Sequence, residues 1–211
     1  MKILHLDSSI LGDASASRVL SAALVDELRT RHPDAQLTSR DLVSNPIGHL
    51  DGPIASGFRQ PGSVASDAAL RAEHALSETL VSELLESDVI VLGVPMYNFS
   101  VPSQLKAWLD RIAQPGRTFR YTETGPVGLS GDKLVVVAST RGGMYSSGPA
   151  NVMDHQESYL KAFFGFIGIQ RVHFVRAELL TKGAELRSTS MRQALAAVPA
   201  VVSDLLSVEG A

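Results

Sequence analysis

Apolar and polar residues alternate along the chain in blocks that predict strands and helices in turn. Apolar runs predict strands at 2–7, 88–94, 133–139 and 171–177, with a more polar strand at 35–40. The runs at 88–94 and 133–139 are almost wholly apolar, which is typical of central parallel strands covered on both faces.

Apolar residues at helical spacing predict the segments between the strands. Leu20, Leu24 and Leu28 form one stripe of a helix at 16–31. Pro102 stands where a helix start tolerates proline, and the helix after it carries a second apolar stripe at Leu105, Trp108, Leu109 and Ile112. The remaining predictions are helices at about 67–86, 159–167 and 188–207, a long connection at 41–66 and an excursion of extended chain and turns at 117–131.

Strands that alternate with helices predict an α/β fold, a doubly wound five-stranded parallel sheet with helices on both faces. Neither an internal repeat nor a domain boundary is visible, so residues 1–211 are expected to form one domain. Ligands of such sheets bind outside the carboxyl ends of the strands. We therefore expect the site in the loops that follow residues 2–7, 88–94 and 133–139.

Composition narrows the classes of function. The chain has no Cys, which removes disulfides, thiolate catalysis and Cys-ligated metals, and its six His show no metal-ligand spacing. The net charge of −3 gives no basic surface for nucleic acid or an anionic membrane. The first residues do not have the pattern expected of a signal peptide, and no apolar run approaches the length expected of a membrane span. We expect a cytoplasmic protein without a metal, nucleic-acid or membrane partner.

The first loop is rich in serine. Ser8, Ser9, Ser15 and Ser17 lie between a strand end and a helix start, where free N–H groups and the helix dipole favour a phosphate. The loop lacks the G-x-x-x-x-G-K-[ST] pattern of nucleotide triphosphatases. Serine also caps helices commonly, so a purely structural role remains open for Ser15 and Ser17.

The second and third loops suit a planar ligand. Residues 95–100 read Pro-Met-Tyr-Asn-Phe-Ser, so Tyr97 and Phe99 would form walls and Asn98 would bind a ring edge. The alternative is that both aromatic rings pack under the next helix. Residues 140–143 read Thr-Arg-Gly-Gly, and glycines let N–H groups approach a ligand closely, although the same residues suit an ordinary turn.

With these loops the chain resembles the FMN-dependent NADH-azoreductase and quinone-reductase family of bacteria. The segments that carry the resemblance occur in family order over essentially the whole chain: Ser8-Ser9 with Ser15-Ala-Ser17, Pro95–Phe99, Thr118-Phe-Arg-Tyr-Thr-Glu123 with Gly125-Pro126, Thr140–Gly143, and Gly165-Phe-Ile-Gly-Ile169. Some family members have Ser in place of Thr140, and the threonine keeps the hydroxyl.

The resemblance implies a flavodoxin-like fold and a homodimer with one non-covalent FMN per subunit. By position, the cofactor-binding residues would be Ser9, Ser15, Ala16 and Ser17 at the phosphate, Met96, Tyr97, Asn98 and Phe99 at the ring edge, and Thr140, Arg141, Gly142 and Gly143 at the pyrimidine end. N–H donors or the arginine there would favour reduction of the flavin. Tyr121 and Phe163 would line the substrate pocket, lent by one subunit to the other.

The implied reaction is ping-pong. NADH or NADPH delivers hydride to the flavin and leaves, and a quinone or azo compound then takes its place and is reduced. No side chain is needed as nucleophile, and none is assigned as catalytic. Two alternatives stay open: an electron carrier of the flavodoxin type, which is usually strongly acidic, and an NAD(P)H:FMN reductase that supplies reduced flavin to partners.

Overall fold

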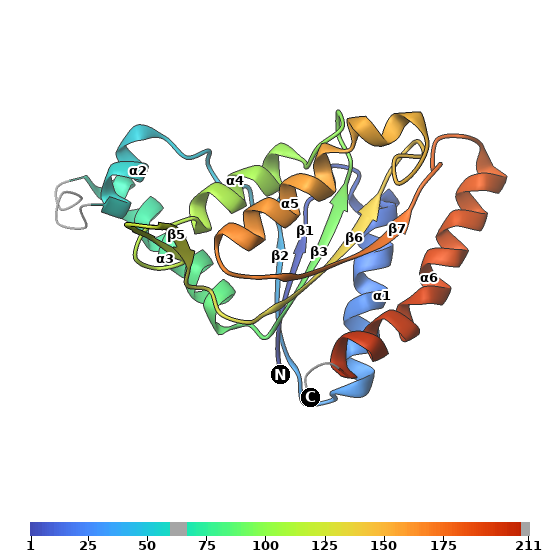
Figure 1. Cartoon of the computed structure of the whole chain (residues 1–211), viewed down its shortest axis with the longest axis horizontal. Helices are drawn as coiled ribbons and strands as arrows, with labels where there is room; N and C mark the ends of the chain where they lie inside the picture. Colours follow the sequence, from blue (N-terminus) through green and yellow to red (C-terminus); the bar gives the residue numbers. More distant parts are fainter. Residues whose placement is uncertain (60–66, 208–211) are drawn as a thin grey trace.

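The computed structural model describes residues 1–59 and 67–207. Its centre is a parallel sheet (Figure 1) of β1 (Lys2–Asp7), β2 (Gln36–Asp41), β3 (Val89–Pro95), β6 (Leu134–Thr140) and β7 (Arg171–Ala177). The strand order is β2-β1-β3-β6-β7, which is the order of flavodoxin-like sheets. The predicted five-stranded, doubly wound α/β fold is confirmed.

Different helices cover the two faces of the sheet (Figure 1). α1 (Ala16–Arg31) and α6 (Ala184–Ser207) pack on one face, where the predicted leucine stripe of α1 is buried. α3 (Ala68–Glu86), α4 (Ser103–Ile112) and α5 (His155–Phe166) pack on the other face around Trp108. Every residue of β3 and β6 is buried between the two layers, as their apolar sequences predict.

Several predicted boundaries are corrected. The strands predicted at 35–40, 88–94 and 133–139 each lie one residue later, and α5 and α6 begin at 155 and 184 instead of 159 and 188. The carboxylate of Asp154 explains the early start of α5, because it accepts hydrogen bonds from two N–H groups of the first turn. This cap precedes the apolar stripe on which the prediction was based.

Part of the predicted connection at 41–66 is helical. Residues 52–59 form α2 (Gly52–Arg59), because Asp51 accepts from the Ile54 N–H at 2.9 Å and Pro53 is tolerated in a first turn. Residues 60–66 of this connection lie outside the described residues. Two short 3₁₀ helices, Gly12–Ala14 and Pro149–Met153, stand in loops where no helix was predicted.

The predicted excursion at 117–131 is an antiparallel hairpin of β4 (Phe119–Thr122) and β5 (Gly125–Gly128). It packs against the end of α5, where the rings of Phe119 and Phe166 lie 4.5 Å apart. A Cβ atom at Gly128 would lie 2.0 Å from the backbone N of Gly168, so only glycine permits this approach. The hairpin is thereby held away from the carboxyl ends of the central strands (Figure 1).

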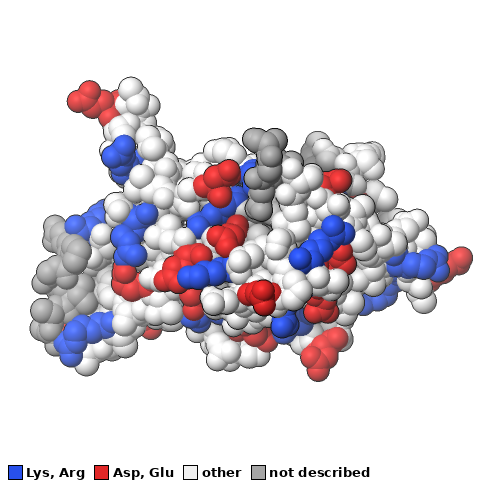
Figure 2. Space-filling view, turned by 90° about the horizontal axis from the view of Figure 1, so that it is seen from below, with Lys and Arg blue, Asp and Glu red and all other residues white. Residues whose placement is uncertain are grey.

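Lys, Arg, Asp and Glu side chains are interspersed over the face shown in Figure 2. Within residues 1–59 and 67–207, none of the helices combines the length and the apolar character needed to cross a membrane. In the same residues, His, Cys, Asp and Glu form no group of three or more that suits a metal ion.

Candidate active site

The loops after β1, β3 and β6 meet at the carboxyl edge of the sheet. The Tyr97 hydroxyl lies 3.3 Å from the Ser9 hydroxyl and accepts a hydrogen bond from the Ile10 N–H at 3.2 Å. The Met96 N–H donates to the Thr140 carbonyl at 2.8 Å. The three loops that the sequence indicated therefore lie next to one another at this edge.

The first loop ends at the N-terminus of α1 with its serines buried. The Ser15 hydroxyl caps the helix by accepting from the Arg18 N–H at 3.3 Å, and it lies 3.0 Å from the Ser17 hydroxyl. The N–H groups of Ala16 and Ser17 have no acceptor in the part of the chain that is described. Unpaired N–H groups and hydroxyls at a helix start suit a phosphate.

The nearest cation of this loop is already paired. The Arg18 guanidinium lies 2.7 Å from the Asp41 carboxylate. Partial burial alone would raise the pKa of Asp41, but hydrogen bonds from Ser44, Arg18 and the neighbouring backbone lower it to about 2. The loop therefore offers neutral hydrogen-bond donors to an anion instead of a free positive charge.

The second loop is a tight turn with backbone strain. Tyr97 and Ser100 exchange backbone hydrogen bonds of 3.0 and 3.1 Å, and the two turn residues, Asn98 and Phe99, have φ of 46° and 72°. Such values are uncommon for Asn and costly for Phe, and strain of this kind gathers at functional sites. Phe99 is 42% exposed, so it does not pack under α4, which was the structural alternative.

A cavity of about 680 Å³ opens beside this turn. Its lining joins the first two loops to α4 and α5: Ile10, Tyr97, Asn98, Ser100, Val101, Ser103, Gln104, Lys106 and Tyr159. Ligand pockets typically enclose about 300–1,000 Å³.

Tyr159 was not among the site residues predicted from the sequence, because it lies one helical turn before Phe163 and resembles a core position. Burial and the negative charge of Asp110 raise the pKa of Tyr159 to about 12, so its phenol stays protonated.

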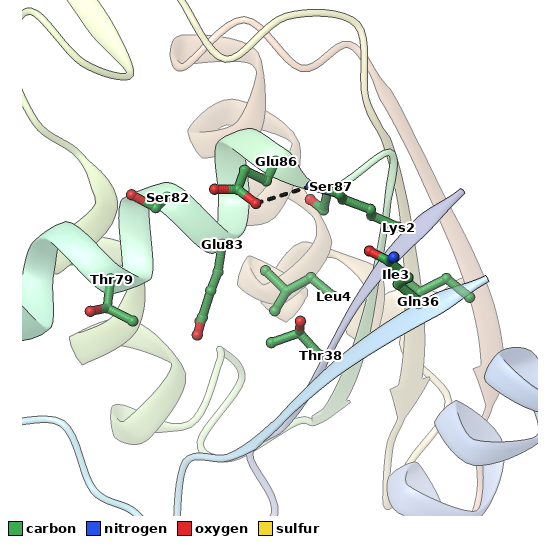
Figure 3. A pocket seen from close by; sticks show the side chains of 10 residues that line it. All are labelled: Lys2, Ile3, Leu4, Gln36, Thr38, Thr79, Ser82, Glu83, Glu86 and Ser87. Carbon is green, nitrogen blue, oxygen red and sulfur yellow. Dashed lines mark hydrogen bonds and ion pairs between the residues drawn. The ribbon is translucent and has the colours of Figure 1, made fainter. Parts of the chain in front are cut away.

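A smaller cavity of about 180 Å³ lies between α3 and the amino-terminal halves of β1 and β2 (Figure 3). Its charged groups are paired within the protein. Glu83 binds Arg40 through hydrogen bonds of 2.5 and 2.7 Å, and Glu86 lies 3.1 Å from Lys2. None of the predicted site residues lines this cavity, so the loops at the other end of the sheet remain the candidate site.

The backbone of the third loop presents a row of N–H groups. The carbonyls of Arg141, Gly142 and Gly143 accept hydrogen bonds of 3.1, 3.2 and 3.1 Å from the segment at 179–181. Because the C=O and N–H of a trans peptide point in opposite directions, the N–H groups of Gly142, Gly143 and Met144 point away from that segment. Among the described residues they meet no acceptor. Successive N–H groups of this kind bind anionic or carbonyl oxygens.

The side chain of Arg141 does not face this surface. It is 0% exposed and forms ion pairs with Asp154 at 3.0 Å, with Glu178 at 3.2 Å and with Glu157. This corrects the expectation of an arginine charge at the pyrimidine end, because three carboxylates already hold the guanidinium inside the protein. Only the backbone of the loop is available to a ligand there.

Two carboxyl groups of this cluster, those of Glu157 and Glu178, have a pKa below the usual range. Burial alone would raise the pKa of Glu157, but hydrogen bonds from Arg176 and the charges of Arg176 and Arg141 outweigh it and hold the pKa below its usual range. Burial would also raise the pKa of Glu178. Hydrogen bonds from the Ser146 hydroxyl and neighbouring N–H groups, together with the charge of Arg141, lower it instead.

Tyr121 does not lie at the loops of its own chain, whereas Phe163 lies one turn of α5 after Tyr159 of the cavity, with the two ring centroids 6.3 Å apart. Tyr121 stands on the β4–β5 hairpin, 73% exposed, and Phe163 lies in the second half of α5. α5 begins at the loops, where the His155 N–H donates to the Phe99 carbonyl at 3.0 Å, and the hairpin packs at its other end. A helix of 12 residues is about 18 Å long, so Tyr121 is remote from its own loops.

The sequence matches known proteins over nearly its whole length. A family described as having a flavodoxin-like fold matches residues 1–201. The chain is 63% identical to an FMN-dependent NADH:quinone oxidoreductase of Ralstonia nicotianae, over 98% of this chain and 100% of that protein. It is 58% identical to FMN-dependent NADH:quinone oxidoreductase 2 of Xanthomonas euvesicatoria pv. vesicatoria, over 96% and 94%. A crystal structure of azoreductase from Bacillus anthracis matches with a TM-score of 0.82 at 26% identity, over 94% of this chain and 99% of that one.

Proposed function

The chain belongs to this flavodoxin-like family, and we propose that it is an FMN-dependent enzyme that oxidises NADH and reduces quinones and azo compounds. The observation that carries the proposal is the meeting of three loops at one edge of the sheet, in a chain 63% identical to an FMN-dependent NADH:quinone oxidoreductase. We take residues 1–211 to act as one domain.

The donors at this edge fit the three parts of FMN. The buried start of α1, with Ser9, Ser15, Ala16 and Ser17, suits the phosphate. The exposed turn of the second loop, with Met96, Tyr97, Asn98 and Phe99, suits the edge of the ring. The outward N–H groups after Thr140 and Arg141, at Gly142 and Gly143, suit the carbonyl oxygens of the pyrimidine end.

When bound, FMN supplies the hydride and electron transfer, and the protein supplies binding, orientation and access. The turn at Asn98 and Phe99 forms a fixed wall, and the cavity beside it admits the nicotinamide or the acceptor. We propose a ping-pong order, in which the two substrates use this one cavity in succession. No residue is required as nucleophile, and the neutral phenol of Tyr159 is a donor to polar groups of either substrate.

We propose further that the enzyme acts as a homodimer in the cytoplasm, where NADH is available. Tyr121 is a large exposed aromatic residue that lies far from the loops of its own chain. Exposed aromatic side chains on a projecting element are typical of contact surfaces. A second copy of the chain would bring Tyr121 and Phe163 to its partner's cavity.

Steady-state kinetics of the purified protein tests the proposal. We expect yellow protein after gel filtration, NADH oxidation with benzoquinone and slower reduction of an azo dye, with parallel double-reciprocal lines as NADH is varied. The same assay with NADPH measures whether the second nicotinamide is used. An electron carrier would not oxidise NADH unaided, and an FMN reductase would lose its flavin on the column and need added FMN. Protein that retains no FMN and leaves NADH unoxidised contradicts the proposal.

A further inference from the structure

A buried network of charges lies directly beneath the third loop. Arg141 donates from Nη1 to Glu178, from Nη2 to Glu157 and from Nε to the Ser139 hydroxyl at 3.1 Å, and its Nη1 forms an ion pair with Asp154 at 3.0 Å. The arginine side chain is 0% exposed, and those of the three carboxylates are 9 to 10% exposed. Burial of charged groups costs free energy, which only full pairing offsets. Packing alone therefore does not explain why this network is buried.

Two of the carboxylates that pair with Arg141, Glu178 and Asp154, also hold the backbone that follows the loop. Oε1 of Glu178 accepts from the N–H groups of Tyr145 and Ser146 at 2.8 and 2.9 Å, and Oε2 accepts from the Ser146 hydroxyl. Asp154 caps the first turn of α5. Because one guanidinium binds both carboxylates, the end of the loop and the start of α5 are fixed relative to each other.

The loop itself is also held by the backbone at 177–181, the segment that carries Glu178. The Arg141 N–H donates to the Ala177 carbonyl at 2.9 Å, and the next three carbonyls accept from residues 179–181. With the carbonyls of the loop fixed on this segment, the N–H groups of Gly142, Gly143 and Met144 point away from 179–181. Donors that are fixed before a ligand binds lose no free energy to reorganisation when charge develops next to them.

We propose that Arg141 and Glu178 are positioning residues, which hold the N–H groups of the third loop toward the pyrimidine end of bound FMN and thereby raise its affinity for electrons. The inference rests on the proposed function and assigns a role to two side chains that do not touch the cofactor. Reduction adds negative charge at the pyrimidine end, and positioned N–H groups stabilise that charge. A loop without its support would favour reduced FMN less.

Glu178→Ala separates positioning from charge. Loss of a carboxylate removes a negative charge, so electrostatics alone would raise the midpoint potential of bound FMN. Positioning predicts the opposite, because the N–H groups of Tyr145 and Ser146 lose their acceptor and the loop loosens. We expect the preference for reduced over oxidised FMN to fall about tenfold, a downward shift of about 30 mV for a two-electron couple.

Three further variants complete the series. Arg141→Met is expected to lower the potential as well, and Arg141→Lys to restore part of it. Glu178→Gln keeps an oxygen acceptor for both N–H groups, so its potential should be the highest among the Glu178 variants. Arg111 is the matched control, because its side chain is also 0% exposed and pairs with Glu73 at 2.8 Å between α3 and α4. Arg111→Met is expected to lower thermal stability and leave the potential unchanged.

Amide hydrogen exchange on the FMN-free protein gives a second readout that does not depend on the cofactor. Exchange in the peptide 142–146 should be faster in Arg141→Met and Glu178→Ala than in the wild type, and unchanged in Arg111→Met. Should Arg141→Met fail to fold, Arg141→Lys and Glu178→Ala carry the test. A potential that rises or stays constant in Glu178→Ala overturns the inference, even in a fully active enzyme. A wild type that binds no FMN overturns the proposed function, whatever the exchange experiment shows.

Discussion

Single residues of the first loop stabilise the start of α1 and, in the function that we propose, also bind the phosphate of FMN. Ser15 caps α1 through the Arg18 N–H, yet the N–H groups of Ala16 and Ser17 are left without an acceptor among the described residues. A cap satisfies one of the free N–H groups of a helix start and leaves the others available. The sequence left open whether these serines have a structural or a binding role. The two roles are compatible, because the cap uses only one of the free N–H groups.

Ser17→Asp is expected to abolish FMN binding while the fold survives. A carboxylate at this position competes for the free N–H groups of α1 and repels the phosphate. FMN absorbance per protein after gel filtration measures binding, and circular dichroism with thermal denaturation measures the fold. Ser17→Ala is the control, since it removes one hydroxyl and is expected to weaken FMN binding about tenfold. Ser17→Asp protein that purifies with a full complement of FMN contradicts the prediction.

That the three loops meet at one edge of the sheet could be predicted from the sequence, and the direction of their side chains could not. Runs such as 88–94 and 133–139 mark buried strands, and the residues after them must lie at one edge of a parallel sheet. The inward turn of Arg141 depends on Glu157 and Glu178, which are 16 and 37 residues away in sequence. Ion pairs between residues so far apart in sequence depend on the folded structure, and no local sequence pattern indicates them.

At the scale of elements, the same limit applies to helix ends and to the hairpin. α5 starts at the Asp154 cap, ahead of the apolar stripe that predicted it. The hairpin was predicted only as extended chain and turns, because a two-stranded ribbon with one buried residue in β4 has no regular apolar alternation. The position of the hairpin is set by backbone contact between Gly128 and Gly168. The spacing of apolar residues in the sequence does not indicate such a contact.

Gly128→Ala is expected to displace the hairpin and to lower quinone reduction while FMN is retained. The added Cβ would meet the Gly168 backbone at 2.0 Å, and backbone cannot yield as a flexible side chain does. A displacement of about 1 Å in a group that orients substrate costs up to about 100-fold in rate, so we expect a loss of about 10-fold to 100-fold in kcat/KM. FMN content and steady-state rates measure the two effects.

Gly52→Ala is the matched substitution for this test. No atom lies within 4 Å of the position that its Cβ would take, so activity and stability should stay close to those of the wild type. Equal loss of FMN and of activity in Gly128→Ala would show that the whole fold is disturbed, which contradicts a role of the hairpin in substrate binding alone.

At the scale of the whole molecule, the proposed dimer predicts complementation between two inactive variants. Ser17→Asp subunits lack FMN but carry Tyr121, and Tyr121→Ala subunits hold FMN but lack the aromatic ring. After equal mixing and exchange, half of the dimers would be mixed, each with one complete site, so about a quarter of the wild-type rate should return. Sedimentation at the assay concentration measures the dimer. A fully active monomer, or no recovery on mixing, refutes the shared site.

The chain has no cysteine among its 211 residues, and this affects how quinone acceptors can damage the enzyme. Quinones are electrophiles that alkylate thiolates, the reactive form of cysteine. A chain without thiols cannot be inactivated in this way and exposes only slower nucleophiles, such as lysine and histidine. Many proteins of the reducing cytosol have few cysteines for unrelated reasons, so the protective effect has to be measured.

We expect the native enzyme to stay active after incubation with excess benzoquinone, removal of the quinone and assay with fresh substrate. Thiol alkylating agents should have no effect on it. Ser100 lines the cavity beside the second loop, so Ser100→Cys places one thiol where we propose that the quinone binds, and this variant should lose activity progressively under the same treatment. Mass spectrometry would locate the adduct on residue 100. If the native enzyme were inactivated as fast as Ser100→Cys, damage would proceed through residues other than cysteine, and the lack of thiols would give this protein no protection.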